Sequence, residues 1–163
     1  MQEDSVRRAR LTDAPGIARV YNQGIEDRIA TFETRLRTDA EIEQWLNGRH
    51  PIVVCTRGDA VTAFASTSAY RDRACYAGIA EFSVYVARDA RSQGLGRMAL
   101  DKLIAEAREA GFWKLLSRIF PENEASRRLV ASAGFREVGF YQKHGQLDGV
   151  WKDVVIVERL LRP

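Results

Sequence analysis

The chain contains 163 residues, which is enough for one domain with a substantial core and short for two. Hydrophobic residues make up 45% of the sequence and charged residues 29%, proportions that exclude an intrinsically disordered chain. The net charge of +3 is spread along the chain without a basic block, which favours small anionic ligands over nucleic acid. We therefore expect a single domain over residues 1–163 that has no nucleic-acid partner.

No apolar run is long enough to cross a bilayer, and the beginning of the chain lacks the pattern of a secretory signal. We therefore expect a cytoplasmic protein with no membrane partner. The two cysteines, Cys55 and Cys75, are too few for a disulfide framework or a metal cluster. They are expected to be reduced thiols, and no metal is expected.

Hydrophobic periodicity and turn residues predict strands and helices in a clear order. Thr12-Asp13 before Pro15 is typical of a helix start with a capping side chain, and Thr38-Asp39 begins a second, short helix. The predicted strands cover residues 5–10, 51–56, 60–70, 80–86, 112–120, 136–144 and 150–161, and the later helices begin at residues 95 and 125. This order predicts an α/β (α+β) fold, a mixed sheet with helices on both faces.

A glycine-bearing turn joins the apolar strand Ala80–Val86 to the helix that follows it. A strand that leads into such a turn and then a helix directs free backbone N–H groups and the positive end of the helix dipole at one point. Gly94 and Gly96 let an anion approach the backbone, and Arg91 and Arg97 add charge. The turn therefore predicts an anion site suited to a phosphate.

Three interpretations of this turn compete. A nucleotide-hydrolysing phosphate loop needs Gly-Lys-Ser or Gly-Lys-Thr after a glycine and four residues, and the chain has no such run. The run Gly94–Ala99 fits a dinucleotide fingerprint formally, with Glu122 as the later acidic residue, but five elements precede it and too little chain follows for a second nucleotide-binding half. The third interpretation uses the arginine as well. Arg91-x-x-Gly94-x-Gly96 after an antiparallel strand resembles the pyrophosphate signature of the GCN5-related N-acetyltransferases, the GNAT superfamily.

The resemblance extends over essentially the whole chain and is closest to one branch. Four stretches are similar to enzymes that acetylate phosphinothricin, arsinothricin and related glutamate-like amino acids: Thr31–Thr34, Tyr76–Val86, Phe120–Asn123 and Gly149–Val154. Ala30–Thr34 and Cys75–Val86 look most like the arsinothricin N-acetyltransferases. The resemblance implies a single-domain GNAT fold whose seven-stranded sheet is mostly antiparallel and is flanked by about four helices.

The resemblance also implies acetyl-CoA as cosubstrate, its pantetheine arm lying along the central strand at Val84, Tyr85 and Val86. The matching pyrophosphate-binding residues are Arg91, Ser92, Gln93, Gly94, Leu95, Gly96 and Arg97, mainly through their amides. Asn123 and Ser126 match further cofactor contacts. Asn123 is also a good helix N-cap, and the two roles are compatible. Val84 and Val86 can belong to the core as well, because only their main chain is used.

Glu81 is the candidate catalytic residue. A carboxylate within an apolar strand is costly to desolvate unless it is partnered or wet, and an edge-strand surface position would also explain it. Its position matches the general base of the branch, which accepts a proton from the substrate ammonium. The chain departs from the wider family at Val130, where many members carry a tyrosine that protonates the leaving thiolate. Protonation of the thiolate is therefore expected from solvent or from Tyr141.

A substrate with an α-carboxylate and a second acidic group needs cations in its pocket. The resemblance points to Phe32, Arg71, Arg73, Tyr76, Glu81 and Lys143 as substrate-binding residues, with His144 given little weight. Phe32 could instead plug the core, and the two arginines could be solvated. In related enzymes the last hairpin meets a second subunit, so a homodimer is expected. The alternatives are acetylation of methionine sulfoximine, methionine sulfone or a peptide N-terminus, and a non-catalytic CoA-binding sensor.

Overall fold

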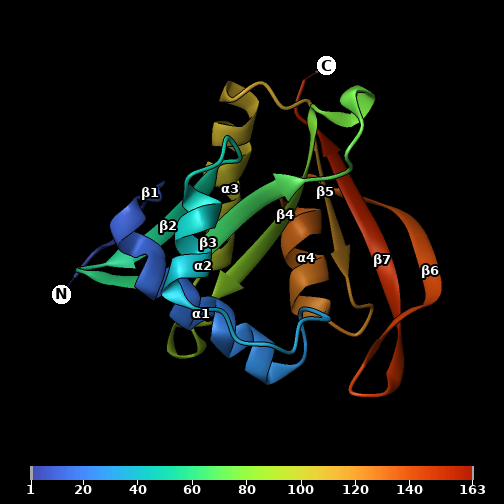
Figure 1. Ribbon diagram of the computed structural model, residues 1–163, viewed down its shortest axis with the longest axis horizontal. Coiled ribbons are helices and arrows are strands. Elements are labelled where there is room, and N and C mark those ends of the chain that lie inside the picture. The colour runs from blue at the N-terminus through green and yellow to red at the C-terminus, as the bar shows by residue number, and fades with distance from the viewer. Residues whose placement is uncertain (1, 163) are drawn as a thin grey trace.

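A computed structural model describes residues 2–162 as one sheet between two layers of helices (Figure 1). The strands are β1 (Asp4–Arg8), β2 (Ile52–Arg57), β3 (Ala60–Ala69), β4 (Ile79–Val86), β5 (Lys114–Ile119), β6 (Arg136–Leu147) and β7 (Val150–Leu160). The helices are α1 (Ala14–Asp27), α2 (Asp39–Leu46), α3 (Leu95–Glu109) and α4 (Glu124–Ser132). Short 3-10 turns occupy Leu11–Asp13, Ala74–Tyr76 and Arg88–Ala90.

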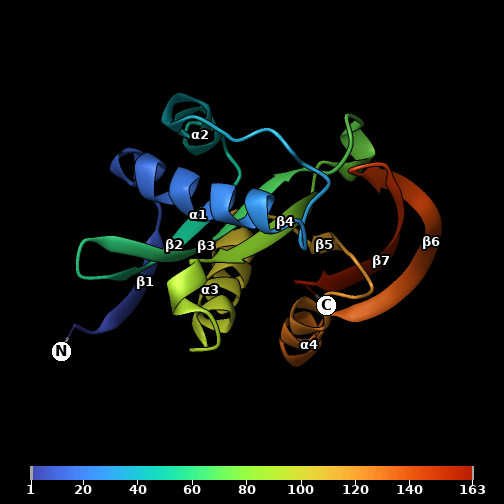
Figure 2. The ribbon, with the colours of Figure 1, turned by 90° about the horizontal axis from the view of Figure 1, so that it is seen from below.

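The strand order in the sheet is β1-β2-β3-β4-β5-β7-β6, and only the central pair, β4 and β5, is parallel. Helices α1 and α2 cover one face of the sheet and α3 and α4 the other, while β6 and β7 curl away at one end (Figure 2). The predicted mixed, mostly antiparallel seven-stranded sheet with four helices is confirmed. No helix among residues 2–162 has the length and apolar character that crossing a bilayer requires.

The helix starts agree with the sequence in one case and differ in another. α2 begins with the predicted Thr38 cap, because the Thr38 hydroxyl accepts from the Glu41 amide and the Glu41 carboxylate accepts from the Thr38 amide. The predicted side-chain cap of α1 at Thr12-Asp13 is wrong, because Asp13 occupies the N-cap position but its side chain makes no capping hydrogen bond. Its carboxylate accepts instead from the Arg10 amide at 2.7 Å and from both terminal nitrogens of Arg7. Burial alone would raise the pKa of Asp13, but these hydrogen bonds lower it.

The last hairpin is longer than predicted. β6 continues to Leu147 rather than ending at His144, and an irregularity in the pairing between Tyr141 and Gly145 absorbs the extra residues. The turn is reduced to Asp148 and Gly149, which have φ values of 51° and 79°. Two consecutive left-handed residues are typical of a tight hairpin turn whose twist matches that of the strands. The hairpin tip is tied to the end of α1 by an ion pair of 2.9 Å between Arg28 and Asp148.

Packing of α1 on β4 forms the part of the core nearest the centre of the sheet. The buried Tyr85 ring stacks on Phe64 at 5.4 Å and meets Tyr21 of α1 edge-on at 5.1 Å. A Cβ atom on Gly24 would lie 2.6 Å from the Tyr85 ring. The absence of a side chain at Gly24 therefore lets α1 approach β4.

Replacing Gly24 with alanine should destabilise the fold. In an exposed helix this change stabilises by roughly 1 kcal/mol, but here we expect a loss of about 1–3 kcal/mol in the free energy of unfolding, because the buried Tyr85 ring has to move. Urea unfolding measures the difference. The control is Gly139→Ala on β6, where an added Cβ meets nothing within 4 Å. A Gly24→Ala variant at least as stable as the unaltered protein would contradict the packing argument.

Candidate active site

Strands β4 and β5 separate halfway along their length. Their parallel pairing covers three residue pairs and ends at Glu81 and Leu116, although β4 continues to Val86 and β5 to Ile119. Just past this point, the Ser117 hydroxyl donates to the carbonyl of Phe82 at 2.8 Å. Beyond it the strands leave a wedge in the middle of the sheet.

The pairing of β3 with β4 determines which backbone groups face the wedge. Residues of an antiparallel pair alternate between hydrogen-bonded and non-hydrogen-bonded positions. The Ala87 amide donates to the Thr62 carbonyl at 2.8 Å, so Tyr85 and Ser83 also bond to β3. The main-chain groups of Val84 and Val86 therefore point away from β3 into the wedge. This is where the resemblance to acetyltransferases places backbone hydrogen bonds to pantetheine.

The turn after β4 has the geometry expected of an anion site. Gly94 has φ of 82° and begins α3, and Ser92 also has positive φ, at 63°. The first hydrogen bond into α3 runs from the Met98 amide to the Gly94 carbonyl. Within residues 2–162, no backbone carbonyl accepts from the amides of Leu95, Gly96 or Arg97, so they are free to bind an anion.

The two arginines of this turn are held by carboxylates. Arg91 donates to Asp27 at the end of α1 at 2.7 Å, and Arg88 donates to the second oxygen of the same carboxylate at 2.8 Å. Hydrogen bonds from Arg88 and Arg91 lower the pKa of Asp27. Arg97 pairs with Asp101 at 2.9 Å. Because these guanidiniums share their charge with carboxylates, the free amides are the principal anion-binding groups.

A cleft of about 390 Å³ connects this turn to the wedge. Among the candidate cofactor-binding residues, its walls include Val84, Tyr85, Val86, Arg91, Ser92, Gly94, Gly96, Arg97, Asn123 and Ser126. Two candidates take no part through their side chains. The Gln93 side chain accepts from Arg57 at 2.7 Å, and Leu95 is buried in the core, so each can offer only main chain to the cleft.

Asn123 connects three elements at the cleft. Its side-chain oxygen accepts from the Ser126 amide at 3.2 Å, which confirms the predicted N-cap of α4. Its side-chain nitrogen donates to the Ile29 carbonyl at 3.2 Å and so ties the segment after α1 to the start of α4. A cofactor contact by this side chain stays a prediction.

Glu81 lines a second hollow, of about 160 Å³, at the point where the strands separate. Phe32, Thr31, Ser83 and Arg118 contribute to its walls, and the Phe32 ring packs edge-on against Phe120 at 4.9 Å. The Glu81 carboxylate accepts from Arg118 at 2.7 Å, and its side chain is 26% exposed. Glu81 is therefore both partnered and wet, and its presence on an inner strand does not by itself require a catalytic role.

Arg118 was not predicted from the sequence, although it lines this hollow and pairs with Glu81. Its signal was present, because alternation along β5 places Arg118 on the same face as Leu116, which is paired with Glu81. Finding it required knowing that β4 pairs with β5, and these two strands lie far apart in the chain. We name the space around Glu81 and Arg118 the Glu81 hollow.

Arg71, Arg73 and Tyr76 line a third hollow, of about 240 Å³, which shares no wall residue with the Glu81 hollow. Arg71 stacks on Tyr70 and Arg73 on Tyr76, and no ion pair holds either arginine within residues 2–162. Tyr70, Tyr76 and Phe32 all pack on one apolar cluster, formed by Ile79, Leu116, Val154 and Ile156. The expected substrate residues therefore flank one cluster but line two separate hollows.

Of three further residues considered for the site, Val130, Tyr141 and Lys143, only Val130 lines the cleft. Val130 is buried and lines the narrow inner part of the cleft. Tyr141 is 50% exposed, stacks on His144 at 4.7 Å, and lines neither the cleft nor the Glu81 hollow. The Lys143 amide donates to Asp153, and Lys143 lines none of the hollows described above. Among residues 2–162, the buried Tyr85 is the only tyrosine that lines the cleft or the Glu81 hollow, where it could stand in for the acid missing at Val130.

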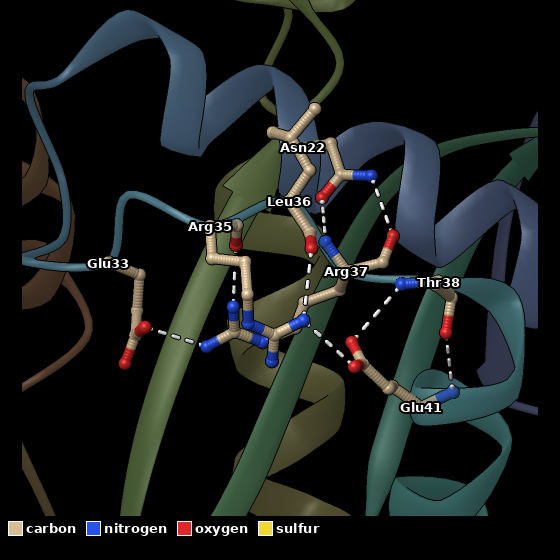
Figure 3. Close-up of polar contacts among 7 residues, drawn as sticks. All are labelled: Asn22, Glu33, Arg35, Leu36, Arg37, Thr38 and Glu41. Carbon is tan, nitrogen blue, oxygen red and sulfur yellow. Dashed lines mark hydrogen bonds and ion pairs between the residues drawn. The ribbon is translucent and has the colours of Figure 1, made fainter.

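The segment between α1 and α2, which carries Phe32, is held by a polar network (Figure 3). The Asn22 side chain accepts from the Arg37 amide at 2.8 Å and donates to the Arg37 carbonyl at 3.0 Å. Arg37 pairs with Glu33 at 2.6 Å, and Arg35 pairs with Glu41 at 2.8 Å. The network fixes the second half of the segment, residues 33–38, and the preceding Ala30, Thr31 and Phe32 line the Glu81 hollow.

Among the described residues, no group of three or more His, Cys, Asp or Glu side chains is placed to hold a metal ion. Cys55 is buried, where desolvation raises its pKa to about 11, and Cys75 is exposed. Both are free thiols, as expected from the sequence.

Comparison with known proteins agrees with this geometry. Residues 17–135 match the model of the acetyltransferase (GNAT) family. The phosphinothricin N-acetyltransferase of Alcaligenes faecalis is 34% identical, covering 96% of this chain and 82% of its own. The L-methionine sulfoximine/L-methionine sulfone acetyltransferase of Pseudomonas paraeruginosa is 32% identical, covering 98% and 95%. A Salmonella typhimurium protein solved with its cofactor acetyl-CoA superposes with a TM-score of 0.93 at 29% identity, covering 98% and 94%.

The separated central strands and the free amides at the start of α3, together with the family and fold matches, place the chain among acyltransferases of the GNAT architecture. The chain belongs to the GNAT family, in its phosphinothricin acetyltransferase branch, and is an N-acetyltransferase. The branch predicted from the glycine turn and the four matching stretches is therefore confirmed.

Replacing Asn22 with alanine should loosen the segment over the Glu81 hollow. The variant loses two half-buried hydrogen bonds to Arg37, and we expect the free energy of unfolding to fall by about 1–3 kcal/mol. Amide hydrogen exchange over residues 29–38 should accelerate by a larger factor than exchange in β4. The control is Asn47→Ala at the end of α2. Unchanged exchange in the segment would show that Asn22 does not hold it.

Proposed function

We propose that this enzyme transfers the acetyl group of acetyl-CoA to the α-amino group of a glutamate-mimicking toxic amino acid, arsinothricin or phosphinothricin, in the cytoplasm, and thereby confers resistance. The observation that carries the proposal is the position of Glu81. This carboxylate lies where β4 leaves β5 and lines the Glu81 hollow, which also holds Arg118 and shares Ala30 and Tyr85 with the cleft suited to acetyl-CoA.

The cleft residues fit acetyl-CoA, which supplies the activated thioester. The main-chain groups of Val84 and Val86 face the wedge, as a pantetheine amide chain requires. The free amides at the start of α3 suit the pyrophosphate, with Arg91 and Arg97 beside them. Asn123 and Ser126 border the same cleft. These residues hold and orient the cosubstrate, and they add no acid or base of their own.

Glu81 serves as general base in this proposal. The α-amino group of an amino acid is mostly in its protonated, ammonium form at neutral pH, and only the neutral amine can attack a thioester carbonyl. Glu81 accepts that proton directly or through a water, for which its 26% exposed side chain leaves room. Because a thiol has a pKa of only about 8.5, the leaving thiolate needs little assistance. Solvent can protonate it, in keeping with the apolar Val130 at the inner end of the cleft.

The second acidic group of the substrate is proposed to meet Arg71 and Arg73. Both guanidiniums lack carboxylate partners among the described residues, and the hollow they line includes Ile79 of the apolar cluster on which Phe32 packs. Phe32 and Tyr76 are placed to enclose the aliphatic part of the substrate. Lys143 lines neither the Glu81 hollow nor the hollow of Arg71 and Arg73. Its proposed substrate role therefore requires a second subunit or a movement of β6 that brings it closer.

A second candidate substrate is methionine sulfoximine or methionine sulfone, which the relative from Pseudomonas paraeruginosa acetylates by its description. These amino acids keep the α-amine and α-carboxylate but have a neutral side-chain group. Arg71 and Arg73 would then have no second acidic group to bind. A peptide N-terminus, or a sensor that binds CoA without turnover, completes the alternatives.

A substrate panel tests the proposal. We expect thiol release from acetyl-CoA with arsinothricin and phosphinothricin, and little with glutamate or an N-terminal peptide. Glu81→Gln should lower kcat by about 10²–10⁴-fold, the usual contribution of general base catalysis, while leaving the Kd of acetyl-CoA unchanged. Turnover is measured by thiol titration and cofactor affinity by calorimetry.

The matched control is Glu106→Gln, an ion-paired glutamate of α3 that lies outside the cleft and the Glu81 hollow. Turnover on methionine sulfone alone would transfer the assignment to the second candidate. A Glu81→Gln enzyme that keeps full kcat would remove Glu81 from the mechanism. Tight CoA binding without any turnover would support the sensor.

We also propose that the enzyme is a homodimer that pairs through the last hairpin. Several large apolar side chains of β6 and β7 are exposed, among them Phe140, Val150 and Trp151, each more than half exposed. β6 is also an outer strand of the sheet, and its unpaired edge suits a second copy of the same edge.

The variant Trp151→Glu should convert the dimer to a monomer, because it places a carboxylate within the buried contact. Light scattering during gel filtration measures the mass. Leu11→Glu, at the opposite end of the sheet and 52% exposed, is the control and should remain dimeric. An unaltered protein that runs as a monomer at all concentrations would refute the proposed interface.

A further inference from the structure

The Glu81 hollow contains one carboxylate and one cation, and they form a pair. Of the residues that line it and the adjoining inner part of the cleft, Glu81 is the only acidic side chain and Arg118 the only basic one within residues 2–162. A terminal guanidinium nitrogen of Arg118 lies 2.7 Å from a Glu81 oxygen. Arg118 lines both spaces, so it stands between the acetyl-CoA side and the substrate side of the wedge.

Arg118 has unused hydrogen-bonding capacity. A guanidinium carries five N–H donors, and the bond to Glu81 is the only hydrogen bond that the Arg118 guanidinium makes within residues 2–162. Its side chain is 46% exposed, so the remaining donors can reach a ligand in the hollow. Guanidinium is well suited to carboxylates because two of its donors match the two carboxylate oxygens.

We propose that Arg118 binds the free α-carboxylate of the amino-acid substrate while Glu81 receives its α-ammonium group. In a free α-amino acid, the two opposite charges are attached to the same carbon. A paired carboxylate and guanidinium 2.7 Å apart present the complementary charges at comparable spacing. This inference rests on the proposed function and makes Arg118 a specificity-determining residue of the same site.

The two separate hollows indicate which cation binds which acidic group of the substrate. Arg71 and Arg73 line a separate space from Glu81, so they are poorly placed to bind a carboxylate next to the amine that Glu81 deprotonates. They remain available for the second acidic group. Each acidic group of the substrate then has its own cation.

The proposal predicts selection for a free α-carboxylate. A peptide N-terminus, a simple amine and an α-carboxamide have an amine but no adjacent negative charge. Such substrates offer Arg118 no carboxylate to bind, either in place of Glu81 or together with it. We therefore expect the enzyme to favour free amino acids over their α-carboxamides by about 10- to 100-fold in kcat/KM, typical of losing one charge-assisted pair.

The experiment compares L-phosphinothricin and L-methionine sulfone with their α-carboxamides. In Arg118→Gln, kcat/KM for each free acid should fall by about 10- to 100-fold, mainly through KM, while the carboxamides change less. The acid-to-amide ratio should therefore approach one. Arg118→Lys, which keeps the charge but loses the fork, should retain an intermediate ratio. Calorimetric Kd values for acetyl-CoA, expected to stay unchanged, report on the integrity of the fold.

The matched control is Arg8→Gln, which removes the partner of Glu106 in an ion pair of 3.5 Å outside the hollow and should leave the ratio unchanged. If Arg118 only positioned Glu81, turnover of acid and amide would fall by the same factor and the ratio would hold, which overturns the inference. Equal use of acid and amide by the unaltered enzyme also overturns it. Turnover on no amino acid would instead remove the proposed function, and this inference with it.

Discussion

The site depends on the early end of one strand pairing. β4 and β5 share three residue pairs and then separate at Glu81 and Leu116. In a continuous sheet the main-chain groups of Val84 and Val86 would bond to β5, and there would be no place for an extended ligand between the strands. Because the strands part, the centre of the sheet presents unpaired backbone to the cleft. The same separation leaves Glu81 beside an opening although it lies on an inner strand.

The elements that surround the wedge keep it open. α4 begins beyond β5 with the Asn123 cap, and that side chain also reaches the Ile29 carbonyl after α1. Gly24 allows α1 to approach Tyr85 on β4, so the helix supports β4 along its unpaired length. The cleft is thus bounded by α1, α4 and the start of α3, which are brought together by the sheet rather than by local sequence.

Local signals were enough to predict most of the fold. Apolar alternation, the Thr38 cap and the Gly94 turn gave the order of elements, because each depends on residues a few positions apart. Contacts between distant segments were missed. Asp13 has the sequence context of a helix cap, but Arg7 on β1 and the Arg10 amide take its carboxylate. Arg71 and Arg73 were expected to bind the same substrate as Glu81, and that role stays a prediction; the sequence could not show that they line a separate hollow, because this depends on contacts between distant segments.

The backbone site shows why the resemblance was needed. Val84 and Val86 are ordinary strand residues, and nothing in their side chains distinguishes them from core residues that bind nothing. Only the pairing pattern shows that their amides and carbonyls are free. The glycine turn was visible from the sequence because free amides there follow from a helix start, which is a local property.

The pair of Glu81 and Arg118 changes how a carboxylate on an inner strand should be interpreted. A glutamate in an apolar strand suggests a catalytic role because burying its charge is costly, but Arg118 and solvent remove most of that cost. An ion pair as exposed as this one contributes only about 0–1 kcal/mol to stability. The fold therefore gains little from placing opposite charges at the point where its central strands separate. What the pair does provide is a charge pattern facing a hollow, and that pattern matters to a ligand that carries both charges itself.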